Sequence, residues 1–185
     1  MTANDLELLN VAGAAFEAVL KEVKQPQLTE PSTCDGWSVR ELVAHVVSGN
    51  LMFVRLVTGA DVAPGEDVLG DDPVRAFRES QDGLWRAFSG EGVLERVFQT
   101  PMGERPASRL VAVRVVELGL HGWDLARSTG QAIDLPEPVM TAALAQLRMM
   151  LPDDRSGLPF GVEREAPEGA SAADRLAAFA GRVVE

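Results

Sequence analysis

The fold of this chain is decided by the stretch Val115-Val-Glu-Leu-Gly-Leu-His-Gly-Trp-Asp-Leu125, which lies within a longer helical pattern from Ala107 to Thr129. Most side chains of this pattern are apolar, so the helix can pack against other helices. The polar side chains share one stripe, since they follow one another at steps of three or four residues: Arg114, Glu117, His121 and Asp124. Burying such a stripe is costly unless its members pair or bind a metal. The stretch therefore predicts a packed helix that carries a polar site.

A second helix is predicted by its own start signal. The residues Ser38-Val-Arg-Glu41 match a capping box, in which Ser38 is the N-cap and the Glu41 side chain reaches back to the Ser38 N–H. The apolar pattern then continues to about Thr58, and Gly59 is placed to end the helix.

The rest of the pattern is also mainly helical. Further helices are expected over residues 5–23, 73–90, 136–151 and 172–179. Loops are expected over residues 25–37 and 60–72, a short strand or extended crossover within 93–106, and an extended segment over 158–163. We therefore predict an all-α fold, a four-helix bundle with short extended segments and a small C-terminal helix, in a single domain over residues 1–185.

Composition restricts the classes of partner. The chain has 185 residues and a net charge of −11, with no cluster of lysine or arginine that could neutralise phosphates, which argues against nucleic acid and against an anionic membrane surface. No apolar run reaches the roughly 18 residues of a membrane span. The acidic N-terminus does not resemble a signal peptide. The single cysteine excludes an internal disulfide and a cysteine-rich zinc site. A cytoplasmic protein is expected.

The two histidines of the chain, His45 and His121, both fall inside predicted helices. Glu117 lies four residues before His121, so the two side chains share one helix face. If the two helices pack together, His45, Glu117 and His121 can converge. Two imidazoles and one carboxylate suit a divalent metal with an open coordination position, and zinc, nickel, iron or manganese would be accepted. The spacing differs from the paired motifs of metalloproteases and di-iron bundles, which favours a mononuclear site.

Charged residues near this trio have alternative interpretations. Asp124 either pairs with Arg127 or Arg114, or orients His121 through the other ring nitrogen. Asp124 and Arg114 are the candidate catalytic residues. A substrate carboxylate could be bound by any of three arginines, and spacing alone does not choose among them: Arg55, Arg109 and Arg114.

Uncharged residues near the trio are interpreted mainly as packing residues. We expect Cys34 to be a small buried cysteine rather than a thiol at the site. Trp37 is expected to be the N-terminal half of a hydrophobic staple rather than a stacking platform, and Trp123 to be a core residue. Gly49, one turn after His45, would leave space beside the imidazole or allow close helix packing.

Three stretches resemble a known family, the DinB-like metal-binding proteins that include the N-terminal domain of mycothiol-dependent maleylpyruvate isomerase. The first is Thr33-Cys-Asp-Gly-Trp-Ser-Val-Arg-Glu-Leu-Val-Ala-His45, which looks like the family's first motif. The second is Glu117-Leu-Gly-Leu-His-Gly-Trp-Asp-Leu-Ala-Arg-Ser-Thr-Gly130. The third is Ala173-Asp-Arg-Leu-Ala-Ala-Phe-Ala-Gly-Arg182, which resembles the C-terminal end of the short-chain members.

The resemblance implies an up-down-down-up four-helix bundle with one metal, usually zinc or nickel, held by His45, Glu117 and His121. It also implies mycothiol or another low-molecular-weight thiol as cofactor, with an electrophilic small molecule as substrate. A bound metal can hold a thiol as thiolate, which would add to the electrophile. The isomerase itself has an additional C-terminal domain, and this chain ends about where the bundle ends, so we do not expect maleylpyruvate as its substrate.

Several functions compete at this point. The first is a thiol-dependent transferase or isomerase-like enzyme. The second is a non-catalytic metal or small-ligand binding module, with the fourth metal position closed by a side chain such as Asp124. The third is a bundle that functions through its surface, with incidental histidines. A metal-dependent hydrolase is also open and would need Asp124 as general base. The sequence also allows a homodimer, although it assigns no apolar stripe to the interface.

Overall fold

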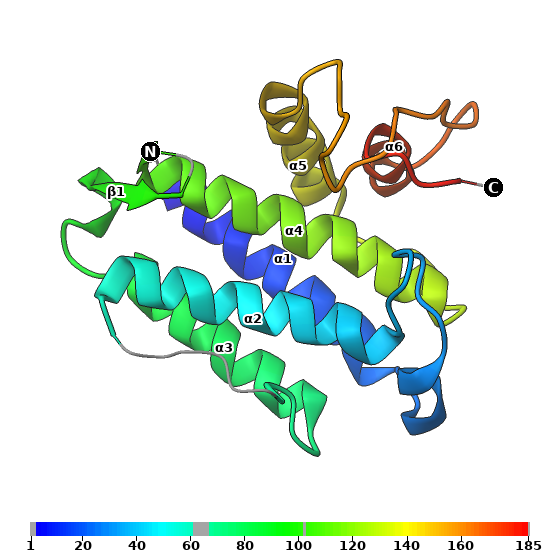
Figure 1. Ribbon diagram of the computed structural model, residues 1–185, viewed down its shortest axis with the longest axis horizontal. Helices are drawn as coiled ribbons and strands as arrows, with labels where there is room; N and C mark the ends of the chain where they lie inside the picture. Colours follow the sequence, from blue (N-terminus) through cyan, green and yellow to red (C-terminus); the bar gives the residue numbers. More distant parts are fainter. Residues whose placement is uncertain (1–2, 61–66, 102, 185) are drawn as a thin grey trace.

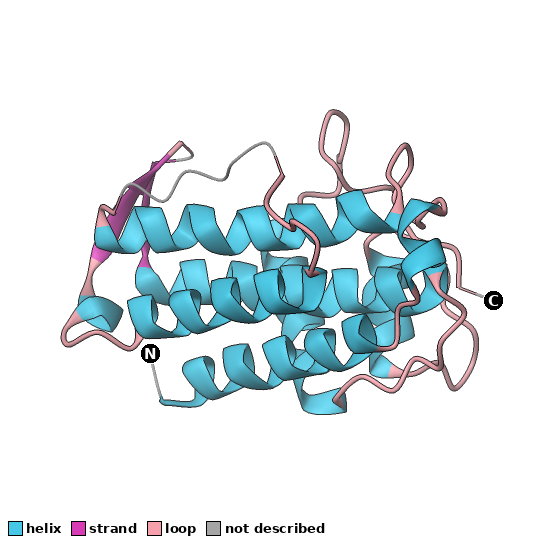
Figure 2. Ribbon diagram, turned by 90° about the horizontal axis from the view of Figure 1, so that it is seen from below, coloured by secondary structure: helices cyan, strands magenta, loops and turns pink. Residues whose placement is uncertain are grey.

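The computed structural model describes residues 3–60, 67–101 and 103–184. Four long helices lie side by side (Figures 1 and 2). They are α1 (Ala3–Lys21), α2 (Val39–Thr58), α3 (Pro73–Phe88) and α4 (Ala107–Ser128). The chain direction alternates as up, down, down, up, because α1 and α4 run one way and α2 and α3 run the other (Figure 1). The expected bundle and its topology are thereby confirmed.

The remaining elements are short or lie outside the bundle. Two helices pack on the outer side of α4, α5 (Glu137–Met150) and α6 (Ala172–Phe179). Two short 3₁₀ helices are η1 (Gln25–Thr29) and η2 (Val93–Glu95). The strands β1 (Val97–Thr100) and β2 (Gly103–Pro106) form an antiparallel hairpin directly before α4. This hairpin replaces the single strand or crossover expected there, and η1 interrupts the loop expected over residues 25–37.

The local signals for helix ends act as the sequence predicts. The Ser38 Oγ accepts a hydrogen bond from the Glu41 N–H at 3.3 Å, while Glu41 Oε2 accepts one from the Ser38 N–H at 2.7 Å. Gly59 ends α2 in the left-handed conformation, with φ 72°, which glycine adopts without the steric cost of a Cβ. Part of the loop expected over residues 60–72, residues 61–66, lies outside the described residues.

The central helix of the fold is α4. It contacts α1 and α2 on one side and α5 and α6 on the other, and most of its side chains from Leu110 to Ala126 are buried. Three of the four residues of its polar stripe are buried with them, since Arg114 and His121 are nearly inaccessible and Asp124 is fully so. The core is therefore built around the helix that carries most of the candidate site.

Helix α2 has the length and the apolar composition that a membrane span would need. Core helices of helical bundles meet the same criterion. Here the buried face of α2 packs on α3 and α4 inside the bundle, and its first turn carries Arg40 and Glu41. We therefore interpret its apolar character as that of a core helix.

Candidate metal centre

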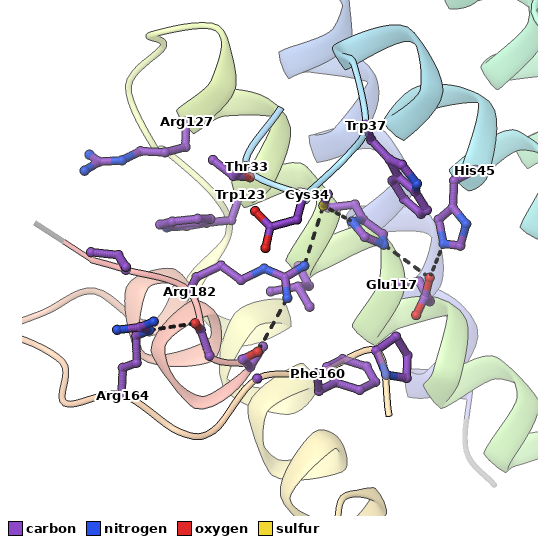
Figure 3. Close-up of a pocket in the computed structure, with 18 residues that line it drawn as sticks. Thr33, Cys34, Trp37, His45, Glu117, Trp123, Arg127, Phe160, Arg164 and Arg182 are labelled. Atoms are coloured by element: carbon purple, nitrogen blue, oxygen red, sulfur yellow. Dashed lines mark hydrogen bonds and ion pairs between the residues drawn. The ribbon is translucent and has the colours of Figure 1, made fainter. Parts of the chain in front are cut away.

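The structure brings the three predicted ligands together between α2 and α4. Figure 3 shows two of them, His45 and Glu117, side by side. A single carboxylate oxygen, Oε2 of Glu117, lies 3.1 Å from His45 Nε2 and 3.5 Å from His121 Nε2. The two imidazole rings meet edge to face, with centroids 5.0 Å apart. One ligand atom from each residue falls within 4.8 Å of the others, a spacing that could hold one metal ion. Convergence of the trio is what the spacing along the helices predicts.

The burial of the trio is graded from one side to the other. The His121 side chain is 9% exposed, that of Glu117 is 23% exposed and that of His45 is 41% exposed. The trio is thus anchored in the core at His121 and opens to solvent at His45. An ion held here would keep at least one position for a ligand that enters from outside.

The electrostatics of the trio favour a cation. Burial alone would raise the pKa of Glu117, but hydrogen bonds with His121 and His45, together with nearby charges, hold it well below its usual value. Burial alone would lower the pKa of His121, yet its contacts with Asp124, Cys34 and Glu117 raise it well above the usual value. The metal-free site therefore keeps an anionic carboxylate beside a proton that a metal ion would displace.

Asp124 fixes the orientation of His121. Its Oδ2 lies 3.0 Å from His121 Nδ1, and because an ionised carboxylate only accepts hydrogen bonds, Nδ1 donates to it, so that Nε2, which faces Glu117, is the nitrogen that a metal ion could take. Burial would raise the pKa of Asp124, but His121 and Arg182 hold it well below its usual range. This is the orienting role that the sequence left open, and Asp124 does not join the trio.

The cation beside Asp124 is Arg182, which follows α6. Its Nη2 and Nε donate to the two Asp124 oxygens at 2.9 and 3.1 Å. Thr33 Oγ1 adds a further hydrogen bond to Asp124 at 2.8 Å. Arg182 closes the resembling C-terminal stretch, but no pattern in the sequence links it to Asp124. The sequence suggested Arg114 or Arg127 as the ion-pair partner of Asp124, whereas the arginine that contacts it is Arg182.

Arg114 lies away from the pocket. Its guanidinium donates to the Val46 carbonyl at 3.2 Å and to Asn50 Oδ1 at 2.9 Å, inside the α2–α4 interface. A Cβ on Gly49 would lie 2.5 Å from Arg114 Nη1, so the glycine makes room for the guanidinium and not for a cavity beside His45. Substrate contact by Arg114 is a wrong expectation because α2 covers it completely.

The other two arginines proposed for a carboxylate also lie elsewhere. Arg109 donates to Gln146 on α5 at 3.1 Å, and Arg55 is exposed in the last turn of α2. Neither lines the pocket beside the metal trio.

Cys34 corrects another expectation. It is partly exposed at the pocket, with Sγ 3.4 Å from Asp124 Oδ2 and 4.0 Å from His121 Nδ1. These three residues form a second group with metal-ligand spacing. However, Arg182 already places a cation there, with Nη2 3.7 Å from the sulfur. Among the described residues, no arginine or lysine forms an ion pair with the first trio, which is therefore the better candidate centre.

The trio opens into a pocket of about 890 Å³. Trp37 forms one wall beside the metal ligands. Its ring centroid lies 4.8 Å from that of His45 with the ring planes tilted by 41°, so Trp37 contacts a candidate metal ligand, which the staple interpretation did not include. Trp123 is buried as expected, yet it also lines the pocket. The opposite wall comes from residues 159–161, 164 and 180–183, which the sequence did not connect with the site.

The structure is thus that of a helical bundle with a candidate metal centre between α2 and α4. Comparison with known proteins shows to which family the chain belongs. The sequence model of one protein family, the mycothiol maleylpyruvate isomerase N-terminal domain, matches residues 9–126. An uncharacterised protein of Mycobacterium tuberculosis, found in strains CDC 1551 and H37Rv, is 34% identical over 172 residues, which are 92% of this chain and 93% of that protein. The chain belongs to the mycothiol maleylpyruvate isomerase N-terminal domain family.

Two solved structures share the fold. They are the mycothiol-dependent maleylpyruvate isomerase, with 21% identity and a TM-score of 0.59, and a histidine-to-alanine mutant of it, with 20% identity and a TM-score of 0.60. Each superposition covers 75% of this chain and 66% of the isomerase chain. At this identity the likeness establishes the fold alone.

Proposed function

We propose that this chain is a metal-dependent, thiol-using enzyme of the transferase or isomerase type. One divalent ion, most naturally zinc, would be held by His45 Nε2, Glu117 Oε2 and His121 Nε2. The observation that carries the proposal is the convergence of these three atoms in a pocket of about 890 Å³. Family membership supports mycothiol, or another small thiol, as the second participant.

The donor set fits such an ion. Two imidazole nitrogens and a carboxylate oxygen are ordinary zinc ligands, and three protein ligands are typical of a catalytic rather than a structural site. The hydrogen bond between His121 Nδ1 and Asp124 leaves the correct nitrogen free for a metal. Bound here, the ion would supply Lewis acidity that lowers the pKa of a thiol entering from the pocket.

The residues around the trio would prepare the thiol and its acceptor for reaction. Trp37 packs against His45 at a tilt, and Trp123 with Phe160 presents apolar surface on the walls beyond it. Such walls restrict water and hold the carbon skeleton of a substrate near the reacting group. Because Asp124 stays ionised and buried, it would keep His121 fixed without exchanging a proton with substrate.

The same geometry weakens the competing functions. A hydrolase would need Asp124 as general base, but its carboxylate is engaged by His121, Arg182 and Thr33 and has no access to the pocket. A binding module closed by Asp124 would need that carboxylate on the metal, whereas Asp124 lies on the Nδ1 side of His121, away from Glu117. Both observations favour a centre that Asp124 leaves open.

The test is a spectroscopic titration of cobalt-substituted protein with mycothiol, and with N-acetylcysteine as a smaller thiol. We expect thiol binding to produce a sulfur-to-cobalt charge-transfer band, and His45→Ala to abolish it together with cobalt binding. The variant Glu22→Gln, changed on an exposed position of the segment after α1, should behave as wild type. Cobalt that binds but does not respond to either thiol would overturn the thiol-using function.

A further inference from the structure

The Arg114 guanidinium lies between the two helices that carry the metal trio. Its Nη2 donates at 3.2 Å to the carbonyl of Val46, the residue after His45, and Arg114 precedes Glu117 by about one turn of α4. We propose that Arg114 acts on the centre without touching substrate: its fixed positive charge weakens the binding of the metal ion and strengthens the binding of a thiolate to it. This inference rests on the proposed function and adds a positioning residue to it.

Arg114 is a buried cation that no carboxylate neutralises by direct contact. The residue is 2% exposed, and guanidinium groups stay charged in proteins. Both of its hydrogen-bond acceptors are neutral, the Val46 carbonyl and Asn50 Oδ1 at 2.9 Å. Among the described residues Arg114 forms no ion pair, and its Nε has no hydrogen-bond partner. The Phe53 ring, 5.5 Å from the guanidinium carbon, offsets part of the cost of burial without adding negative charge.

Packing alone is a weak explanation for such a residue. An unpaired charge is costly to bury, and apolar side chains could join two helices at lower cost. The opposing helix also leaves space for this group, because a Cβ on Gly49 would lie 2.5 Å from Arg114 Nη1. The structure therefore accommodates a charge in the α2–α4 interface, and the charged groups of the nearby trio are those on which it acts most strongly.

The other charges around the trio show which carboxylate Arg114 serves. Asp124 is neutralised in direct contact by Arg182, at 2.9 Å. Burial raises the pKa of Glu117, whereas hydrogen bonds with His121 and His45 and the nearby charge of Arg114 lower it. The field of Arg114 thus reaches a candidate metal ligand. With both carboxylates offset by arginines, a divalent ion would keep most of its charge for attracting a thiolate.

The metal ion and the thiolate should therefore respond to Arg114 in opposite directions. A fixed positive charge repels the ion and attracts the thiolate. A distorted α2–α4 interface would instead weaken the binding of both, because His45 comes from α2 and the other two ligands come from α4. Opposite changes in the two affinities distinguish an effect of charge from an effect of packing.

The test compares two variants that remove the net charge in different ways. Arg114→Met deletes the cation, whereas Asn50→Asp keeps it and places a carboxylate where Asn50 Oδ1 now accepts its hydrogen bond. Zinc affinity is measured by competition with a chromophoric chelator, and the affinity of cobalt-loaded protein for N-acetylcysteine by the sulfur-to-cobalt absorption band. In both variants we expect zinc to bind about tenfold more tightly and N-acetylcysteine about tenfold more weakly. If Arg114→Met does not fold, Asn50→Asp decides alone.

Ser80→Ala is the matched control, because Ser80 accepts a hydrogen bond from Asn50 Nδ2 at 3.1 Å and belongs to the same buried network without carrying a charge. It should keep both wild-type affinities, as should Arg86→Gln, which removes a charge from an exposed position of α3. If both affinities fall together in the folded test variants, or if neither changes, the inference is overturned. If the cobalt-loaded wild type binds no N-acetylcysteine, the thiol-using function fails, and the zinc affinities still decide whether Arg114 acts on the metal.

Discussion

Asp124 and Glu117 approach His121 from opposite edges of its ring. Asp124 Oδ2 contacts Nδ1 at 3.0 Å, and Glu117 Oε2 lies 3.5 Å from Nε2. Asp124 therefore orients the imidazole through Nδ1, while Nε2 faces the Glu117 carboxylate, with which it could bind the same metal ion. This relationship divides the polar stripe of α4 into a residue that would bind metal and a residue that would position the ligand.

The variant Asp124→Asn tests this division. It keeps the shape of the side chain but removes the charge that fixes the His121 tautomer, so we expect zinc affinity to fall about 10–100-fold. The measurement is competition with a chromophoric chelator, on protein whose circular dichroism shows that it is folded. Asp82→Asn makes the same change on the exposed face of α3 and should bind zinc as wild type. Equal affinities in the two variants would contradict the orienting role.

His121 belongs to two possible groups of metal ligands, and Cys34 belongs to only one of them, so a Cys34 variant distinguishes the two groups. Its sulfur lies on the Nδ1 side, where Arg182 already donates to it and to Asp124. We therefore expect Cys34→Ser to retain its full complement of metal. The check is elemental mass spectrometry of the purified variant. Loss of metal from Cys34→Ser, with the fold intact, would move the centre to Cys34, His121 and Asp124.

Gly49→Ala tests the packing of α2 on α4. The new methyl would lie 2.5 Å from Arg114 Nη1. That guanidinium is buried and hydrogen-bonded, so it cannot move away without losing hydrogen bonds or packing. We expect the free energy of unfolding to fall by about 1–3 kcal/mol in urea denaturation. Gly83→Ala on α3 is the matched control, because its nearest new contact is 3.6 Å from Val54. There the gain in helix propensity should leave stability unchanged or raise it by up to about 1 kcal/mol. Equal effects at both glycines would contradict this account of Gly49.

Glu17 gives a prediction for pH. Hydrogen bonds from Arg78 at 2.7 Å lower the pKa of Glu17, and this pair joins α1 to α3. A carboxyl whose folded pKa is lowered stabilises the protein above its unfolded pKa and loses that effect as pH falls through the folded pKa. Glu17→Gln should therefore cost about 0.5–1 kcal/mol in the free energy of unfolding at neutral pH. Urea denaturation at stepwise lower pH should show the difference between variant and wild type vanish in acid. A difference that persists in acid would assign the effect to packing.

The helices and the metal trio could be predicted because their signals are local. The capping box at Ser38, the glycine after Thr58 and the step of four between Glu117 and His121 each act within one or two helical turns. His45 required one further assumption, that α2 packs on α4. The amphipathic patterns of both helices supported that assumption, and the family resemblance carried the same three residues.

The surroundings of the trio could not be predicted in the same way. The contact of Arg182 with Asp124 joins residues that are 58 positions apart, and no periodicity records such a pairing. The Arg114 guanidinium occupies the space left by the missing side chain of Gly49, and this contact depends on how closely α2 and α4 approach each other. Trp37 satisfied a local staple pattern, but the loop that follows η1 turns its ring onto His45. Tertiary geometry, and not propensity, decides each of these contacts.

The most direct test of the central claim is the metal content of the protein purified without an affinity tag, measured by elemental mass spectrometry beside His45→Ala and His121→Ala. The account predicts about one equivalent of a divalent metal in the wild type, as expected of a three-ligand mononuclear site, and its loss in both variants. A wild type that stays free of metal after incubation with zinc and removal of the excess would contradict it, as would variants that retain the wild-type content.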